Sequence, residues 1–150
     1  GINAFRGAGR RFEFLGEVNG VTIADDYAHH PTELEATLRA AKEMDYKRVW
    51  AVFQPFTYTR TQMLLDDFAR VLQIADKVVM TEIMGSRERA EDYAVRTKDL
   101  AAKVPGSVWY DTFDEVVDHV MKNARPGDLV ITLGCGDIYK AAKKMVAWEA

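Results

Sequence analysis

Residues 21–33 of the chain read VTIADDYAHHPTE, and this stretch decides the fold. Its first four residues are mostly apolar and predict a strand. From Pro31 through about Met44, apolar side chains such as Leu34 and Leu38 recur at helical spacing and predict a helix. Proline suits the first turn of a helix, where its missing N–H group would have no partner. A short polar segment therefore links a strand to a helix.

The same alternation continues along the chain. Asn19 and Gly20 lie between two apolar stretches, residues 11–18 and 21–24, and predict a tight hairpin. Alternating strands and helices predict an α/β fold: a three-layer, Rossmann-like, mostly parallel sheet with helices on both faces and the antiparallel hairpin at one edge. Further strands are expected at residues 49–53, 78–80, 108–110 and 129–133, and helices at residues 64–75, 97–103, 116–120 and 138–145, with a polar loop at 85–94.

Bulk composition limits the classes of function. The 150 residues suffice for one domain, 1–150, with a real core. A net charge of −3 gives no general attraction to nucleic acid or anionic membrane, so neither partner is expected. No apolar run approaches the roughly 20 residues of a membrane span, and no signal peptide is visible. The single cysteine, Cys135, fits a reducing, cytoplasmic location.

Three polar segments follow predicted strands, at residues 25–33, 54–61 and 134–137. Parallel strands bring their carboxyl ends to one edge of a sheet, which is where open α/β sheets bind ligands. We therefore expect the three segments to meet at one rim and to form the functional site.

The first segment allows several functions. Asp25 and Asp26 could hold ribose hydroxyls, bind a metal ion or cap the following helix. His29 and His30 could ligate a metal, but neighbouring histidines cannot easily share one ion. The chain also lacks a pair of histidines four residues apart, so no metal site is expected. His119 lies among valines of a predicted helix, which favours a structural role.

The second segment, residues 54–61, reads QPFTYTRT and ends in an arginine at a predicted helix start. Arg60 could bind phosphate or carboxylate, assisted by the backbone N–H groups of that helix. The alternative is a solvated arginine with Thr59 or Thr61 as the N-cap.

The third segment, Gly134-Cys135-Gly136-Asp137, has neither the third glycine of the dinucleotide fingerprint nor the Lys-Ser/Thr of a P-loop. A plain tight turn and a close approach to a ligand both remain open. No activating partner for Cys135 as a nucleophile can be assigned from the sequence.

Together these motifs resemble the C-terminal domain of the Mur ligase family, from about residue 9 to residue 146. The resemblance is carried by RRFE at 10–13, DDYAHHPTE at 25–33, FQP at 53–55 with YTRT at 58–61, and GCGDI at 134–138. The YTRT version favours the alanine-adding branch, since the branch that recycles a tripeptide tends to read Glu-Pro-Arg-Ser-Asn-Thr there. The family has three domains, and its P-loop lies in a central ATPase domain. We therefore expect an excised domain, inactive alone, that lacks the UDP-sugar and ATPase domains; the start at Gly1, without Met, agrees.

The resemblance implies an ATP-dependent carbon–nitrogen ligase of peptidoglycan synthesis. Such an enzyme joins L-alanine to UDP-N-acetylmuramate through an acyl phosphate, and its C-terminal domain closes the site against water. ATP with Mg²⁺ is implied, the metal being held mainly by the absent central domain. The alternatives are the tripeptide-recycling ligase, a non-catalytic nucleotide-binding module, and a metal phosphohydrolase built on Asp25, Asp26, His29 and His30.

The resemblance also implies roles for individual residues. Arg11 matches an arginine near the ATP phosphates, and Asp26 matches the aspartate that binds the ribose hydroxyls. Tyr27 and His29 lie where the family approaches the nucleotide and the incoming amino acid. Arg60 matches an arginine that could hold the alanine carboxylate. The expected catalytic residues are thus Arg11, His29 and Arg60; Arg11, Asp26 and Tyr27 would bind the nucleotide, and Tyr27, His29 and Arg60 the substrates.

The remaining motif residues have smaller implied roles. His30, Thr32 and Glu33 are expected to support the loop and cap the helix. The chain departs from the family pattern at Phe56-Thr57, where His-Arg is frequent, and so loses one potential cation. Cys135 stands where the family often has alanine, a small change.

Overall fold

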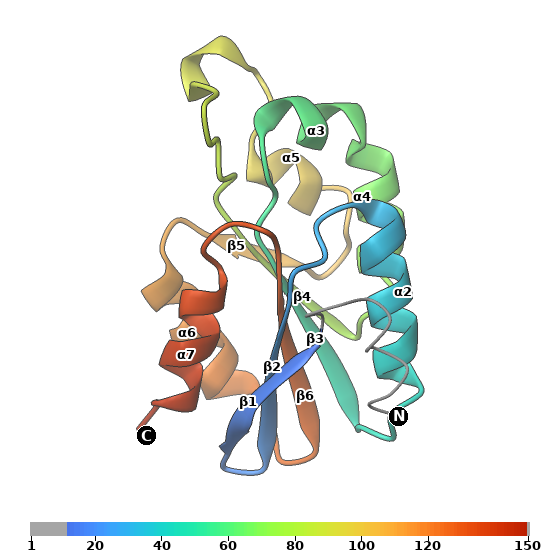
Figure 1. The fold of residues 1–150 in the computed structure, drawn as a ribbon, viewed down its shortest axis with the longest axis vertical. Coiled ribbons are helices and arrows are strands. Elements are labelled where there is room, and N and C mark those ends of the chain that lie inside the picture. Colours follow the sequence, from blue (N-terminus) through green and yellow to red (C-terminus); the bar gives the residue numbers. More distant parts are fainter. Residues whose placement is uncertain (1–11, 150) are drawn as a thin grey trace.

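The computed structural model describes residues 12–149, which form one six-stranded sheet (Figure 1). The strand order is β1-β2-β6-β3-β4-β5; β1 pairs antiparallel with β2, and all other pairs are parallel. The predicted fold class and the antiparallel edge are thus confirmed. The strands are β1 Glu13–Val18, β2 Val21–Asp26, β3 Arg48–Phe53, β4 Lys77–Thr81, β5 Val108–Tyr110 and β6 Asp128–Leu133.

Helices cover both faces of the sheet (Figure 1). One apolar cluster joins the sheet to α2, α4 and α5, and a second joins its other face to α6 and α7. None of these helices, all within residues 12–149, is both long and apolar enough to cross a membrane. The helices are α2 Pro31–Lys42, α3 Tyr58–Met63, α4 Leu65–Leu72, α5 Thr97–Ala101, α6 Phe113–Asn123 and α7 Tyr139–Val146, with a 3-10 turn at Ala90–Asp92.

The two central strands have apolar side chains on both sides. Along β6, Leu129, Ile131 and Leu133 belong to the first apolar cluster and Val130 to the second. This alternation follows from the two-residue period of a strand. A strand covered by helices on both faces needs a continuous apolar run, and this is the pattern that the sequence shows.

Local signals account for several element boundaries. Asn19 and Gly20 have φ angles of 53° and 82°, the left-handed values that a two-residue hairpin turn requires. Thr112 and Glu115 form the predicted capping box of α6. The helix predicted at 64–75 is shorter: Leu64 separates it from α3, and it ends at Leu72 with Gln73 as its C-cap.

One boundary shift changes the site. Strand β2 continues to Asp26, whereas the sequence predicted its end at Ala24. The backbones of Asp25 and Asp26 pair with Thr132 and Leu133 of the neighbouring strand β6. The two aspartates therefore belong to the sheet and not to the loop that follows it.

The sheet reverses its winding between β3 and β6. The chain leaves β3 toward α4 on one face and leaves the neighbouring β6 toward α7 on the opposite face. Connections that diverge in this way open a crevice beyond the carboxyl ends of the two strands. The candidate site lies at this crevice.

Candidate functional site

The three polar segments meet at one rim, as the sequence predicted. The backbone N–H of Gly134 donates to the carbonyl of Asp26 at 3.3 Å, and that of Gln54 donates to the carbonyl of Leu133 at 3.0 Å. A side-chain bond of 2.9 Å also runs from Nε2 of Gln54 to Oδ1 of Asp137. Adjacent parallel strands hold the segments together, so the rim is part of the rigid sheet.

Asp26 is fully buried at the end of β2. Its Oδ1 accepts a hydrogen bond from the backbone N–H of Ala28 at 2.8 Å, and its Oδ2 accepts one from the hydroxyl of Thr37 at 2.9 Å. The carboxylate therefore ties the loop after β2 to helix α2. It does not cap α2, a role that the sequence left open for one of the two aspartates.

Asp25 points toward the neighbouring strand β6. Its Oδ1 accepts a hydrogen bond from the hydroxyl of Thr132 at 2.6 Å. Burial raises the pKa of the Asp25 carboxyl; the bond from Thr132 opposes this, and the charges of Asp26 and Glu13 add to it. The adjacent aspartates thus have different partners, because successive side chains of a strand point to opposite faces.

The loop between β2 and α2 presents an aromatic pair. Tyr27 is 52% exposed, and its ring meets that of His29 edge-on at 5.7 Å between centroids. Nδ1 of His29 lies 3.1 Å from the carbonyl of Tyr27 and 3.4 Å from Oε1 of Glu33. His30 is the N-cap of α2 and forms a capping box with Glu33, so their predicted supporting role is confirmed. Tyr27 is thus left exposed, whereas His29 is partly buried by these contacts.

Arg60 lies in the short helix α3. Its guanidinium makes no hydrogen bond or ion pair with any residue of the described part of the chain, and the residue is partly exposed. The N-cap of α3 is Thr57, whose Oγ1 accepts from the N–H of Arg60 at 3.3 Å, so the prediction of Thr59 or Thr61 as the cap is wrong. Thr57 has a φ of 62°, a conformation that the sequence pattern did not indicate.

The first N–H groups of α3 are already occupied by a carboxylate. Oε1 of Glu88 accepts from the N–H groups of Tyr58 and Thr59, and its Oε2 accepts from the hydroxyl of Thr59. The hydrogen bond from the Thr59 side chain lowers the pKa of Glu88, and the backbone bonds add to this effect. These N–H groups therefore hold Glu88 instead of the anionic ligand that the sequence analysis considered, and the side chain of Arg60 remains for a ligand.

Sequence reasoning missed Glu88 and the anchoring of its loop. The guanidinium of Arg96 donates to the carbonyls of Ala90, Tyr93 and Val95 and lies 5.7 Å from the ring centroid of Tyr58. The loop is thus fastened both to itself and to α3. A polar run carries no spacing signal for such contacts, so only the folded chain reveals them.

The glycine turn after β6 packs closely against Gln54. A Cβ atom on Gly136 would lie 2.6 Å from Oε1 of Gln54, so a larger residue there would displace the end of that side chain. That Oε1 atom is buried and is the one buried side-chain polar atom of the described residues without a hydrogen-bond partner. Burial raises the pKa of the Cys135 thiol, Arg60 opposes this and Glu33 adds to it. The raised pKa leaves a protonated thiol, which disfavours a nucleophile.

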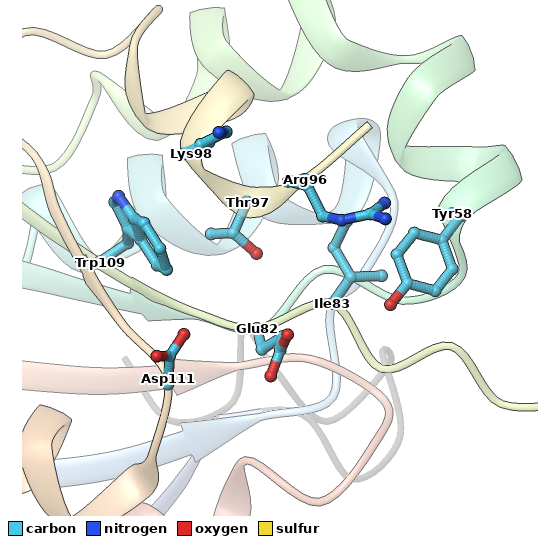
Figure 2. Close-up of a pocket in the computed structure, with 8 residues that line it drawn as sticks. All are labelled: Tyr58, Glu82, Ile83, Arg96, Thr97, Lys98, Trp109 and Asp111. Atoms are coloured by element: carbon cyan, nitrogen blue, oxygen red, sulfur yellow. The ribbon is translucent and has the colours of Figure 1, made fainter. Parts of the chain in front are cut away.

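A cavity of about 180 Å³ opens beside this rim, beyond the ends of β4 and β5 (Figure 2). The carboxylates of Glu82 and Asp111 face it from one side, and the ammonium of Lys98 and the indole of Trp109 border it elsewhere. Tyr58, which belongs to the polar segment at residues 54–61, also lines this cavity. This mixture of acidic, basic and aromatic groups suits a small polar ligand, although the sequence did not single out these residues.

Within residues 12–149, no group of three or more His, Cys, Asp or Glu side chains is placed to hold a metal ion. Arg11, the expected phosphate contact, lies outside the described residues.

Comparison with known proteins identifies relatives. A family model described as Mur ligase, glutamate ligase domain, matches residues 10–136. The UDP-N-acetylmuramate–L-alanine ligase of Acetivibrio thermocellus is 43% identical over 157 residues, an alignment that covers 98% of this chain and 33% of that protein. The chain thus spans about a third of the length of the curated relatives it matches.

Solved structures agree on the fold. The UDP-N-acetylmuramate–alanine ligase of Thermotoga maritima superposes with a TM-score of 0.73 and 22% identity, over 97% of this chain and 35% of that chain. A domain attributed to a UDP-N-acetylmuramate:L-alanyl-γ-D-glutamyl-meso-diaminopimelate ligase of Haemophilus ducreyi superposes with a TM-score of 0.70. Its sequence is 26% identical, over 91% of this chain and 98% of that chain. The second likeness is to a domain of similar length that was solved by itself.

Proposed function

This chain belongs to the Mur ligase family, whose glutamate ligase domain it represents, and we propose that it closes the active site of a larger, cytoplasmic, ATP-dependent ligase. That ligase would join L-alanine to UDP-N-acetylmuramate in peptidoglycan synthesis, and the chain alone would be inactive. The proposal is supported by 43% identity to an enzyme named for this reaction and by the length of the match, which leaves two thirds of that enzyme unmatched.

One structural observation carries the assignment of the site. At the crevice between β3 and β6, most side chains of the three segments are engaged in holding the fold, whereas Tyr27 is exposed and His29 and Arg60 are partly exposed. Arg60 has no partner of its own within residues 12–149. An arginine without an internal partner suits a ligand that carries a carboxylate or phosphate.

We assign these three residues to the substrates. The guanidinium fork of Arg60 would hold the carboxylate of alanine, because two parallel N–H donors match a carboxylate. Tyr27 and His29 would line the space between the nucleotide and the attacking amine. Positioning and charge neutralisation supply most of the catalysis in phosphoryl transfer, so these contacts would act by alignment.

Asp26 and Arg11 remain the proposed nucleotide contacts. Both oxygens of Asp26 already accept hydrogen bonds inside the chain. Each carboxylate oxygen has a second lone pair, so a ribose hydroxyl could share an oxygen with Ala28 or Thr37 once the covering atoms move aside. For Arg11 the proposal rests on its place in the RRFE motif.

ATP with Mg²⁺ would be the phosphoryl donor. The Mg²⁺ ion would be held mainly by the ATPase domain of that ligase. This chain would contribute the fixed charge of Arg60 and the aromatic pair at the rim. Closing the rim over the substrates would exclude water, which would otherwise hydrolyse the acyl phosphate.

The decisive experiment measures phosphate release by the complete ligase that contains this chain, with ATP, Mg²⁺ and UDP-N-acetylmuramate. L-Alanine is added to one series and the tripeptide L-alanyl-γ-D-glutamyl-meso-diaminopimelate to another. We expect release that depends on L-alanine. Release only with the tripeptide would reassign the chain to the recycling ligase, and release with neither would favour a non-catalytic nucleotide-binding module.

Two variants of the complete ligase test the residue roles. Arg60→Ala should raise the KM for alanine by about 10- to 100-fold, the loss expected for a charged hydrogen-bonded contact. Arg87→Ala removes an equal charge from an exposed loop position and should leave that KM unchanged. A defect of Arg60→Ala confined to ATP would contradict the assignment of Arg60 to alanine.

A further inference from the structure

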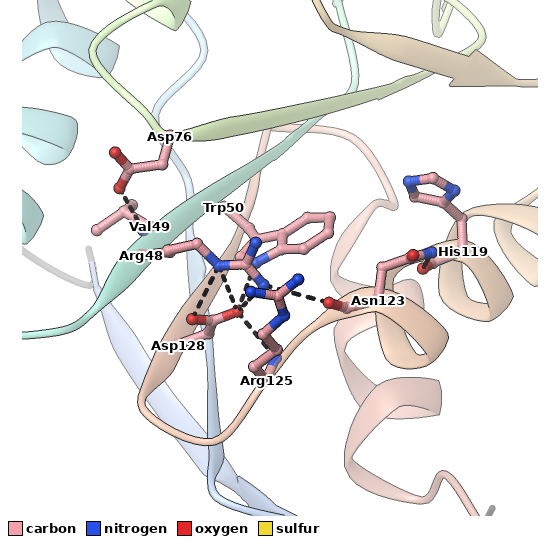
Figure 3. A network of polar contacts seen from close by, with 8 residues as sticks. All are labelled: Arg48, Val49, Trp50, Asp76, His119, Asn123, Arg125 and Asp128. Atoms are coloured by element: carbon pink, nitrogen blue, oxygen red, sulfur yellow. Dashed lines mark hydrogen bonds and ion pairs between the residues drawn. The ribbon is translucent and has the colours of Figure 1, made fainter.

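A second cavity lies at the opposite end of the sheet from the proposed active site. It measures about 210 Å³ and is bordered by the amino-terminal ends of β3, β4 and β5 and by helix α6 (Figure 3). None of the motif residues that define the rim takes part in it. Its lining residues include Arg48, Trp50, Lys77, His119, Asn123 and Arg125.

This cavity concentrates positive charge in a chain whose net charge is −3. Three cations, Arg48, Lys77 and Arg125, line it, and the described residues that line it include no carboxylate. Figure 3 shows the side chains of Arg48 and Arg125 extending toward each other. Like charges gathered around one hollow repel each other unless an anion joins them.

The nearby carboxylates are already committed elsewhere. Asp128 accepts two hydrogen bonds from the guanidinium of Arg48, from Nη2 to Oδ2 at 2.8 Å and from Nε to Oδ1 at 3.2 Å (Figure 3). It also accepts hydrogen bonds from Nε1 of Trp50 and from the backbone N–H of Arg125. Asp76 pairs with Lys42 at 2.8 Å and accepts from the N–H of Val49. Of the three cations that line the cavity, Arg48 is thus balanced by Asp128.

The other two cations have no counterion of their own. Within residues 12–149, the side chains of Lys77 and Arg125 make no ion pair or hydrogen bond, and both residues are exposed. Their charges are therefore available to a ligand in the cavity.

His119 adds a neutral donor to this hollow. Its Nδ1 lies 2.9 Å from the hydroxyl of Tyr110, which leaves Nε2 for the cavity. If the tyrosine donates, Nε2 carries the proton and can donate to an anion. Burial lowers the pKa of His119, the charge of Lys77 lowers it further, and Asp118 opposes both. An anion in the cavity would reverse the effect of Lys77.

We propose that this cavity binds a phosphate dianion, either free or as a phosphate monoester. Lys77 and Arg125 supply unpaired charge, Arg48 supplies a guanidinium edge beside them, and His119 supplies a ring N–H. Guanidinium and ammonium groups are the usual partners of phosphate, and a hollow of about 210 Å³ is large enough for one phosphate group with part of its ester. Because it lies away from the rim, the site would be separate from substrate binding.

The test is an NMR titration of the 150-residue chain with inorganic phosphate at neutral pH, against sodium chloride at equal ionic strength. We expect saturable shifts at the His119 ring and at the backbone amides of Lys77 and Gly106, together with a raised pKa of His119. A parallel titration with glycerol 3-phosphate distinguishes the two sources. Comparable binding shows that the site accepts monoesters, and binding of inorganic phosphate alone shows a site for the free ion.

Matched variants locate the site. Lys77→Ala/Arg125→Ala removes no internal hydrogen bond and should weaken phosphate binding at least about tenfold. Arg87→Ala/Lys98→Ala removes the same charge from exposed positions near the other end and should change binding by less than about twofold. Arg60→Ala should retain it as well.

Several outcomes would overturn the proposal. These are equal shifts with chloride, shifts centred on residues 27–30 or 54–61, unchanged affinity in the Lys77/Arg125 variant, and no response of His119 in the unmodified chain.

Discussion

Two buried carboxylates, Asp26 and Asp128, lie at opposite ends of the sheet. Asp26 ends β2 and accepts hydrogen bonds from Ala28 and Thr37, and the loop that it fastens carries the exposed Tyr27 and the partly exposed His29. Asp128 begins β6 and is almost as deeply buried. Its partners include Arg48 and fasten β3 to the turn before β6.

The difference teaches that a buried charge does not by itself mark a functional site. Around Asp128, Arg48 is paired with the carboxylate through its Nε and Nη2 atoms. At the rim near Asp26, Arg60 has no partner within residues 12–149. The carboxylates are alike in burial, and at each end it is the unpaired cations, Arg60 at the rim and Lys77 and Arg125 beside the second cavity, that indicate a ligand site.

The largest expected effect is on Asp128. Asp128→Ala should lower the free energy of unfolding by about 3–5 kcal/mol, because it leaves the buried Trp50 N–H without an acceptor and breaks a partly buried ion pair with Arg48. Urea unfolding at pH 7 measures this change. Asp118→Ala, which removes an acidic side chain from a partly exposed helix position, is the control and should cost under about 1 kcal/mol.

The loss should also depend on pH. Burial raises the pKa of Asp128, but the bonds from Arg48, Arg125 and Trp50 outweigh it, so the pKa is lowered overall. The stabilisation is therefore present above the unfolded-state pKa of about 3.9 and is lost as the pH falls through the folded-state pKa. A deficit of Asp128→Ala that stayed constant down to pH 2 would contradict this account.

Asp26→Ala comes second. It should cost about 2–3 kcal/mol, since it leaves the buried N–H of Ala28 and the hydroxyl of Thr37 without an acceptor. In the complete ligase it should also raise the KM for ATP, measured by phosphate release at saturating alanine. Thr37→Val removes one of these bonds and should cost less stability. An unchanged KM would remove Asp26 from the nucleotide contacts and leave it the same structural role as Asp128.

Asp25→Asn should change the free energy of unfolding by a smaller amount and should raise it. The folded-state pKa of Asp25 is raised, so its contribution to stability is present below the unfolded-state pKa and is lost as the pH rises through the folded-state value. The amide keeps an oxygen for the Thr132 hydroxyl but cannot ionise. We expect a gain of up to about 1 kcal/mol at pH 7 that disappears near pH 3. Thermal unfolding of the variant and of the wild type at the two pH values measures this gain. Equal stability of the two proteins at pH 7 would contradict the prediction.

Arg60→Ala should have the smallest effect on stability. With no internal partner to lose, it should change the free energy of unfolding by less than about 0.5 kcal/mol. Arg48→Ala is the matched comparison and should cost several times more, because it strands the buried Asp128. Urea unfolding of both variants measures the contrast. If Arg60→Ala proved as costly as Arg48→Ala, the distinction between the two ends of the sheet would fail.

Much of the fold could be predicted because it depends on short-range signals. The hairpin follows from Asn19-Gly20, the cap of α6 from Thr112 and Glu115, and the central strand from the apolar run of β6. Each signal lies within a few residues of the structure it determines. The meeting of three motifs at one rim was also predictable, since parallel strands align their carboxyl ends.

Details that depend on long-range contacts could not be predicted. The local pattern could not separate the adjacent Asp25 and Asp26, since their roles depend on Thr132 and Thr37 in other elements. The occupation of α3 by Glu88 joins residues about thirty positions apart. A polar loop has no periodicity from which such a contact could be inferred.

The sequence by itself thus determined the order of elements, the parallel sheet with its hairpin edge, and the motifs that mark the rim. Only the tertiary structure decided which charged groups have partners. Arg48 pairs with Asp128, and Glu88 accepts hydrogen bonds from the first N–H groups of α3. The guanidinium of Arg60 has no partner within residues 12–149. The physical reason is the separation along the chain of the residues that interact. Periodicity acts over a few residues, whereas the balance of a charge depends on side chains that only folding brings together.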